Sequence, residues 1–244
     1  MDALPLLNKT ILITGAARRV GKLFALGCAQ AGADIIIHYG HSASQAEETC
    51  GEIEALGRQA WSLQADLSQP TEAANLITLA NQAAPLFALV NSAAIFESLT
   101  LADTALPDWE RHLKINLTAP FLLSQAFAAQ LSGESTGRIV NILDWRALRP
   151  RADHFPYTIS KAALAALTKS MAAALAPQIT VNGLALGAVL PPVDAGDTSK
   201  ITAKIPMERW STPEEVQQAL IFLLSGPAYV TGEIIYVDGG RHLI

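Results

Sequence analysis

Short apolar runs alternate along the chain with longer segments whose apolar residues recur at helical spacing. The run Thr10–Thr14 is stopped by Gly15 and predicts a buried strand. The next segment repeats apolar or small residues and stops near Gly32, which predicts a helix. The same alternation predicts further strands at about 33–39, 59–64, 87–91, 138–143, 179–184 and 233–237, and further helices at about 42–56, 70–83, 107–131, 155–176 and 212–224.

This alternation predicts an α/β fold, a doubly wound parallel sheet of about seven strands with helices on both faces. The length suits one domain over residues 1–244. In such sheets ligands bind beyond the carboxyl ends of the strands, where the candidate residues below all lie. The irregular stretch 187–210 contains three prolines and is expected to be a substrate loop, with a plain solvated connection as the alternative.

Composition narrows the class of protein. Half of the residues are hydrophobic and 16% are charged, which suits a sheet buried on both faces. The net charge of −5 argues against a nucleic-acid partner, and Arg18-Arg19 is too short for a basic patch. Cys28 and Cys50 lack metal-ligand spacing, so we expect no metal site and interpret both as packing residues in a reducing compartment.

The two ends of the chain suggest location and assembly. Residues 1–8 lack the features of a signal peptide, and no window supplies the roughly 20 apolar residues of a membrane helix. We therefore expect a cytoplasmic protein with no membrane partner. The apolar residues 229–244 predict an edge strand that a partner subunit could cover.

The turn Thr14–Gly21 joins the first predicted strand to its helix. Unpaired N–H groups and the helix dipole at such a turn favour a pyrophosphate. Gly15 permits the tight turn, and Gly21 lets the helix pack closely on the strand. The position of the turn after the first strand predicts a nucleotide site.

Residues after the second and third predicted strands bear on which nucleotide binds. An enzyme that prefers NAD usually places an acid about 20 residues beyond the turn, and here there is none. Arg18, His41 and Ser42 could instead surround a 2′-phosphate, which favours NADP(H), although an exposed loop role remains open for His41. Asp66 could accept a hydrogen bond from an adenine amino group, and N-capping of the next helix through Ser68 is an equally good account.

Tyr157 and Lys161 lie four residues apart, hence on one face of a predicted helix. A cation near the phenol is expected to lower the pKa of Tyr157 and make it a proton donor and acceptor near neutral pH. Hydride transfer needs such a group. The spacing alone is common on surface helices, so it does not by itself establish a catalytic pair.

Several motifs in this order together resemble the short-chain dehydrogenase/reductase family. They are the glycine turn, Asn91-Ser92-Ala93-Ala94, Asn116, Tyr157-x-x-x-Lys161 and Val237-Asp238-Gly239-Gly240, and they span the chain essentially end to end. The resemblance implies an NAD(P)-binding Rossmann fold, with Tyr157 as acid and base, Lys161 on the nicotinamide ribose and Asn116 in a water-linked proton relay. It implies a homotetramer as well. We also expect cofactor contacts at Val20, Leu67, Asn91, Ala93 and Gly187.

Three departures from the commonest family pattern are informative. Arg19 replaces the middle glycine of the turn, Asp144 replaces the serine thirteen residues before the tyrosine, and Leu186-Gly187 replaces a Pro-Gly pair. With Arg19 and Asp144, the chain resembles the pteridine reductase branch. The ending Asp238–Leu243 is similar to that of bacterial dihydromonapterin reductases.

The chemistry of Asp144 supports that branch independently. A ketone develops negative charge on oxygen during reduction, and a neighbouring carboxylate would repel it. Reduction of a ring C=N bond brings a proton to nitrogen, which a carboxylate can assist together with Tyr157. The resemblance implies that Phe96 stacks on a flat heterocycle, with a core aromatic as the alternative. Arg19 could reach both the pyrophosphate and a pterin carbonyl.

The sequence therefore predicts NADPH-dependent reduction of a small molecule, a dihydropterin such as dihydromonapterin or dihydrobiopterin, to the tetrahydro form. A carbonyl reductase acting, for example, on 3-oxoacyl thioesters is the second hypothesis, because the scaffold serves many substrates. A non-catalytic NADP-binding protein is the third, and the Tyr157/Lys161 pair argues against it.

Overall fold

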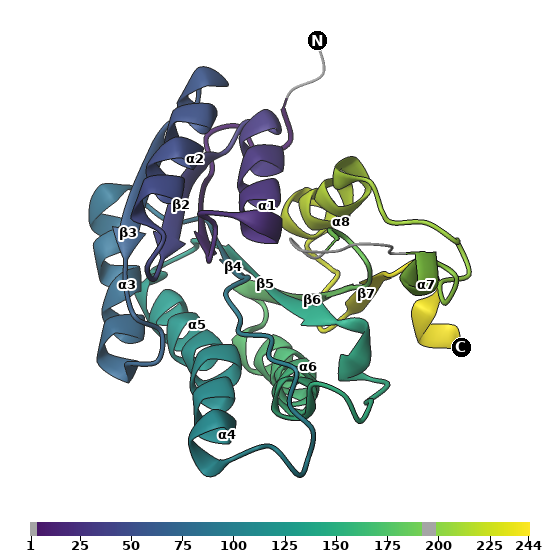
Figure 1. Cartoon of the computed structure of the whole chain (residues 1–244). Coiled ribbons are helices and arrows are strands. Elements are labelled where there is room, and N and C mark those ends of the chain that lie inside the picture. Colours follow the sequence, from purple (N-terminus) through teal and green to yellow (C-terminus); the bar gives the residue numbers. More distant parts are fainter. Residues whose placement is uncertain (1–3, 192–198) are drawn as a thin grey trace.

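The computed structural model describes residues 4–191 and 199–244, and the seven strands found there form one parallel sheet (Figure 1). The strand order is β3-β2-β1-β4-β5-β6-β7. Every neighbouring pair is parallel. The strands are β1 (Thr10–Thr14), β2 (Asp34–Tyr39), β3 (Ala60–Gln64), β4 (Ala88–Asn91), β5 (Gly137–Asp144), β6 (Ile179–Leu186) and β7 (Ile234–Val237).

Helices cover both faces of the sheet, which confirms the doubly wound fold predicted from the alternating pattern. Figure 1 shows α1, α2 and α8 on one side and α3, α5 and α6 on the other. The α-helices are α1 (Arg19–Gln30), α2 (Ala43–Ala55), α3 (Pro70–Ala83), α4 (Leu106–Leu113), α5 (Ala119–Gln130), α6 (Phe155–Leu175), α7 (Ser199–Thr202) and α8 (Pro213–Ser225).

Each face of the sheet has its own hydrophobic core, because successive strand residues point to opposite sides. In β1, Ile11 and Ile13 pack with α1 and α8, where Phe24 is fully buried. Leu12, between them, packs on the other face with α3 and α5. The continuous apolar runs of the central strands thus follow from burial on both faces.

The long helix predicted at 107–131 is interrupted. A π-helical turn, Lys114–Thr118, separates α4 from α5. Pro120 has no N–H, so the carbonyl of Asn116 cannot receive the usual α-helical bond from it. An inserted wider turn resolves this conflict, and such turns often occur at functional sites. Asn116 lies in that turn and is fully buried.

The predictions for the two ends of the chain and for the loop after β6 have different outcomes in the structure. β7 is an edge strand, as predicted from residues 229–244. The stretch 187–210 is not wholly irregular, because α7 lies within it, and its residues 192–198 fall outside the described residues. Residues 1–3, part of the segment considered for a signal peptide, also fall outside them.

The two cysteines are not joined by a disulfide. Both cysteines are free thiols, with Cys28 buried and Cys50 half-buried, as expected for packing residues. Burial raises the pKa of Cys28 to about 12. Over the described part of the chain, no helix combines the length and apolar character needed to cross a bilayer.

Gly21 makes the close approach of α1 to the glycine turn possible. A Cβ at this position would overlap the carbonyl oxygen of Gly15 and lie 2.8 Å from Ala16 Cα, both backbone atoms. We expect Gly21→Ala to lower the free energy of unfolding by about 1–3 kcal/mol, as overpacking does. Urea denaturation measures this change.

Gly51 offers a matched control, because it lies within α2 and nothing would approach its added Cβ within 4 Å. Gly51→Ala is expected to raise stability by up to roughly 1 kcal/mol through helix propensity. Equal urea midpoints for the two variants would contradict the packing role assigned to Gly21.

Candidate active site

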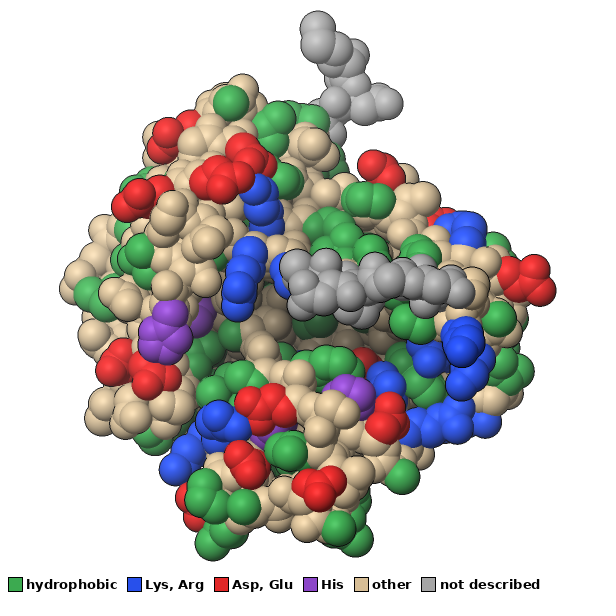
Figure 2. All heavy atoms as spheres, in the orientation of Figure 1, with side chains coloured by type: hydrophobic (Ala, Val, Ile, Leu, Met, Phe, Trp, Pro, Cys, Tyr) green, Lys and Arg blue, Asp and Glu red, His purple; other side chains and the backbone are tan. Residues whose placement is uncertain are grey.

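Two adjoining cavities lie at the carboxyl ends of the central strands, where ligands bind in open α/β sheets. The glycine-turn cavity, of about 460 Å³, extends along the turn after β1, and the tyrosine cavity, of about 440 Å³, surrounds Tyr157. They share Arg19, Val20, Ser92 and Ala94. Figure 2 views the hollowed face of the molecule, where Lys and Arg side chains border the hollow.

Most of the predicted cofactor residues line the glycine-turn cavity. They are Gly15, Arg18, Arg19, Val20, Gly21, His41, Ser42, Asp66, Leu67 and Ala93. Tyr157, Lys161 and Gly187 line the tyrosine cavity instead. Asn91 lines neither cavity, because its side chain is buried in the core.

Two strand-end side chains that the sequence analysis missed hold the glycine turn. The Gly15 N–H donates to His38 Nδ1 at 3.1 Å, and His38 Nε2 lies 3.0 Å from the Ala65 carbonyl. The ring therefore accepts at Nδ1 and donates at Nε2, and burial lowers its pKa, which keeps it neutral. Thr14 Oγ1 accepts from the N–H groups of Ser92 and Ala93 at 2.9 and 3.0 Å.

The backbone of Arg19 is left-handed, which explains why the short-chain dehydrogenase/reductase pattern commonly has glycine at this position. Its φ of 53° lies in the left-handed region, which costs a non-glycine residue free energy. Its guanidinium donates to the Pro191 carbonyl at 2.9 Å and lines both cavities. The strained backbone thus places a cation between the two cavities.

Arg18, His41, Ser42 and Asp66 all line the glycine-turn cavity. The Ser68 N–H donates to Asp66 Oδ1 at 2.9 Å and lowers the pKa of that carboxyl. Helix capping through Ser68 is wrong, because α3 begins after Gln69, which makes no side-chain cap bond. The hydrogen bond from Ser68 to Asp66 therefore stabilises the turn after β3 at the cavity wall.

The two oxygens of the Asp144 carboxylate have different partners in the tyrosine cavity. The Tyr157 hydroxyl donates to Oδ2 at 3.2 Å. The backbone N–H of Arg146 donates to Oδ1 at 2.8 Å, and the guanidinium of the same residue lies 3.5 Å from that oxygen. Asp144 consequently caps the short 3-10 helix Trp145–Ala147 and also contacts the phenol.

The expected lowering of the Tyr157 pKa is wrong for this arrangement. Burial, followed by the negative charge of Asp144 and its hydrogen bond, raises the pKa of Tyr157 well above 10. Lys161 Nζ donates to the Ile142 carbonyl at 2.7 Å and lies 5.8 Å from the centre of the phenol ring. Burial lowers the pKa of Lys161 to about 8. Tyr157 is therefore a protonated donor here.

The buried Asn116 amide is fully engaged by protein partners. Its Oδ1 accepts from the Ile95 N–H at 2.9 Å, and its Nδ2 donates to the Ile95 carbonyl and to Ser160 Oγ. Asn116 thus fixes the segment that leads to Phe96. Its role in a water-linked relay stays a prediction.

A buried polar network that the sequence did not reveal holds Asn91. Asn91 Nδ2 donates to Asn141 Oδ1 at 2.8 Å, and Asn141 Nδ2 donates to Thr168 Oγ1 at 2.9 Å. These bonds join β4, β5 and α6 beneath the cavities. Asn91 consequently positions the strand end from which Ser92 and Ala93 project.

Phe96 is 53% exposed, which excludes the alternative of a core aromatic. Its ring stacks on His154 with centroids 4.0 Å apart and an interplanar angle of 8°. It meets the Tyr157 ring edge to face at 4.6 Å. Phe96 therefore stands directly beside the phenol on the wall of the tyrosine cavity.

Sequence reasoning also missed wall residues of the tyrosine cavity that come from distant segments. Val189, Ile201 and Trp210 supply apolar surface from the loop after β6, and Arg241 arrives from the C-terminal turn. No local motif marks these residues. Only the loop containing three of them was anticipated as a substrate loop.

Comparison with known proteins gives the family. A family model described as "Enoyl-(Acyl carrier protein) reductase" matches residues 15–242. A 3-oxoacyl-[acyl-carrier-protein] reductase from Synechocystis is 33% identical over 234 residues, covering 94% of this chain and 95% of the relative.

Two solved structures match over nearly the whole chain. FolM alternative dihydrofolate reductase 1 from Brucella canis, complexed with NADP, is 32% identical with a TM-score of 0.90 and covers 100% of this chain and 97% of its own. A short-chain dehydrogenase from Burkholderia cenocepacia in complex with NADP is 33% identical with a TM-score of 0.91, covering 97% and 99%. This chain belongs to the short-chain dehydrogenase/reductase family of oxidoreductases.

Proposed function

We propose that this protein uses NADPH to reduce a dihydropterin, such as dihydrobiopterin or dihydromonapterin, to its tetrahydro form. The observation that carries the proposal is the hydrogen bond from the Tyr157 hydroxyl to the Asp144 carboxylate. The similarity to the Brucella canis protein, whose name is alternative dihydrofolate reductase, supports the same class of substrate.

The carboxylate favours reduction of a C=N bond over reduction of a ketone. A ketone oxygen gains negative charge in the transition state, and Asp144 would stand beside it as a second negative charge. A ring nitrogen gains a proton instead, so a carboxylate lowers the energy of the partly cationic transition state. Asp144 thus selects the reaction by charge.

The residues around the cavities fit a dinucleotide and a flat ring. A Cβ on Gly15 would lie 2.9 Å from Ala93 Cα, and its φ is 67°, so glycine is what lets the turn lie against Ala93 at the wall of the glycine-turn cavity. The nicotinamide supplies the hydride when it is bound. Gly15, Gly21 and Arg19 hold the pyrophosphate, and Lys161 holds the nicotinamide ribose.

The chain's own groups handle the proton and the ring. Tyr157, protonated because its pKa is raised, donates its proton to the ring nitrogen. Asp144 orients the phenol and shares the proton, Phe96 stacks on the pterin, and Arg19 contacts a pterin carbonyl. Asn116 fixes the segment that bears Phe96.

The cofactor choice is tested at Arg18, which lines the glycine-turn cavity with His41 and Ser42. Arg18→Ala is expected to raise the KM for NADPH about 10- to 100-fold, because a charge-assisted contact to the 2′-phosphate is lost. The KM for NADH should change much less, because NADH has no such phosphate.

Lys22→Ala is the matched control, since Lys22 lies in the first turn of α1, the helix that begins directly after Arg18, but pairs with Glu48 and Glu52 and does not line the cavity. It should leave both KM values unchanged. Equal rises for NADPH and NADH in Arg18→Ala would contradict the assignment of the 2′-phosphate.

The second candidate is reduction of a 3-oxoacyl thioester, which the name of the Synechocystis relative suggests. NADPH oxidation measured side by side with dihydrobiopterin and acetoacetyl-CoA separates the two. We expect the higher kcat/KM with the pterin. Turnover of acetoacetyl-CoA without turnover of any dihydropterin would overturn the proposal.

The proposal includes a cytoplasmic homo-oligomer. β7 is an edge strand, and the residues that follow it end in exposed Leu243 and Ile244. Exposed strand edges pair readily with a second chain. Light scattering on the purified protein would give the mass, and a tetramer is the expected result.

A further inference from the structure

Three arginine side chains surround the buried indole of Trp145 beside the tyrosine cavity. The guanidinium carbons of Arg241, Arg146 and Arg151 lie 4.7, 4.9 and 5.3 Å from the centre of the indole ring. A guanidinium over an aromatic face keeps N–H donors at its edge free for an anion. Arg241 and Arg146 also line the cavity itself.

Charge is not balanced within this cluster. Arg146 pairs with Asp153 at 2.9 Å and lies 3.5 Å from Asp144. Among the residues that the structure describes, no carboxylate lies within 4.0 Å of the guanidinium of Arg241 or of Arg151. Burial, Arg146 and Arg151 lower the pKa of Arg241, and the charges of Asp144 and Asp153 oppose this only in part. A partly buried cation beside other cations is stabilised by an added negative charge.

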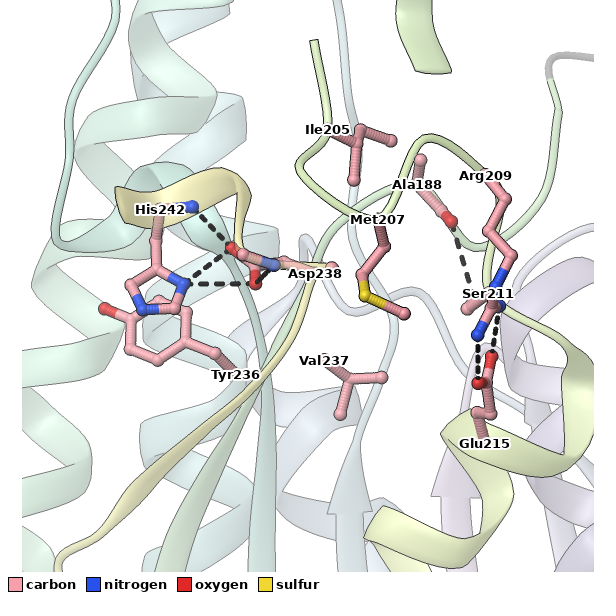
Figure 3. Close-up of a pocket in the computed structure, with 12 residues that line it drawn as sticks. Ala188, Ile205, Met207, Arg209, Ser211, Glu215, Tyr236, Val237, Asp238 and His242 are labelled. Atoms are coloured by element: carbon pink, nitrogen blue, oxygen red, sulfur yellow. Dashed lines mark hydrogen bonds and ion pairs between the residues drawn. The ribbon is translucent and has the colours of Figure 1, made fainter. Parts of the chain in front are cut away.

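The backbone that carries Arg241 is held firmly. The buried Asp238 carboxylate accepts from the N–H groups of Gly240 and His242 at 3.0 and 2.7 Å, and from His242 Nδ1 at 2.9 Å. Figure 3 shows His242 turned toward Asp238 and lying over the ring of Tyr236, with centroids 3.9 Å apart. Arg241, between these anchored residues, is thus positioned before any ligand arrives.

We propose that Arg241, Arg146 and Arg151 form an anion-binding subsite that holds a carboxylate or phosphate on the tail of the substrate. The inference rests on the proposed function in one respect, that the reacting group of the substrate lies beside Tyr157 and Asp144. Carboxylates on a pterin tail and the phosphates of a coenzyme A thioester share the chemistry that a guanidinium cluster recognises.

The test compares charged and neutral substrates in two pairs. Dihydrofolate carries two carboxylates, whereas dihydrobiopterin has a neutral side chain. Acetoacetyl-CoA carries phosphates, whereas ethyl acetoacetate is neutral. The measured quantity is the ratio of kcat/KM for the charged member to that for the neutral member. In Arg241→Gln this ratio is expected to fall roughly 10- to 100-fold, the effect of losing a charge-assisted hydrogen bond.

Arg138→Gln is the matched control. Arg138 is also partly buried, with a pKa lowered by burial, but it lies near the start of β5, whereas Asp144 ends that strand. This variant should retain the wild-type ratio, so a general effect of removing a buried arginine is separated from a local one.

Each outcome either supports or overturns the anion-binding subsite. An unchanged ratio in Arg241→Gln, or a wild-type protein that prefers neither charged substrate, would overturn it. If only acetoacetyl-CoA is turned over and its ratio to ethyl acetoacetate falls in Arg241→Gln, the subsite is supported and the pterin function is overturned. If the ratio of dihydrofolate to dihydrobiopterin falls, both are supported.

Discussion

Replacement of Tyr157 by phenylalanine is expected to lower kcat for dihydropterin reduction about 10²- to 10⁴-fold, the usual contribution of a positioned acid. The phenol is the group that donates to Asp144, and its raised pKa keeps the proton on it until transfer. Phenylalanine fills the same space and keeps the contact with Phe96, so the fold should be unaffected. NADPH binding, followed by fluorescence, should remain near the wild-type value.

Tyr229→Phe provides the control, since Tyr229 is fully exposed and does not line the tyrosine cavity. It should retain wild-type kcat. If Tyr157→Phe kept more than about a tenth of wild-type kcat, a different proton donor would have to be identified.

Asp144→Ser is the second large effect, and it separates the two enzyme hypotheses. We expect kcat/KM for the dihydropterin to fall about 100-fold, because the carboxylate no longer assists protonation of the ring nitrogen. Turnover of acetoacetyl-CoA should rise, because the negative charge beside the developing oxyanion is removed. Steady-state assays with both substrates measure the switch.

Two further variants separate charge from structure at this position. Asp144→Asn retains an oxygen that can accept from the Arg146 N–H, so it preserves the cap while it removes the charge. It should lose pterin turnover to a similar extent. Asp103→Ser, at an exposed carboxylate, should change neither activity. Full pterin turnover in Asp144→Ser would contradict the charge argument.

The fold could be predicted from the sequence because its signals are local. The run Thr10–Thr14, which Gly15 follows, marks a strand that is buried on both faces. The π-helical turn at Lys114–Thr118 escaped prediction, since its residues read as continuous helix and the cause lies at Pro120. Helical periodicity does not report a single extra residue in one turn.

Site residues that belong to a sequence motif could be predicted. Properties that depend on burial in the folded protein could not. Tyr157 and Lys161, which their spacing predicted to lie on one helix, both belong to α6 and both line the tyrosine cavity. The direction of the Tyr157 pKa was wrong, because it depends on burial and on Asp144, neither of which spacing reveals. His38 contacts Gly15, and Arg241 lies over the ring of Trp145. These partners are distant in the chain, so no local sequence pattern could identify the two residues.

A crystal structure of the ternary complex with NADP⁺ and oxidised biopterin would show how the reacting ring is held. The pterin ring is expected between Phe96 and the nicotinamide, with a ring nitrogen within hydrogen-bond distance of the Tyr157 hydroxyl and Asp144. A pterin bound outside the tyrosine cavity, or one whose ring nitrogens face away from Asp144, would contradict this expectation.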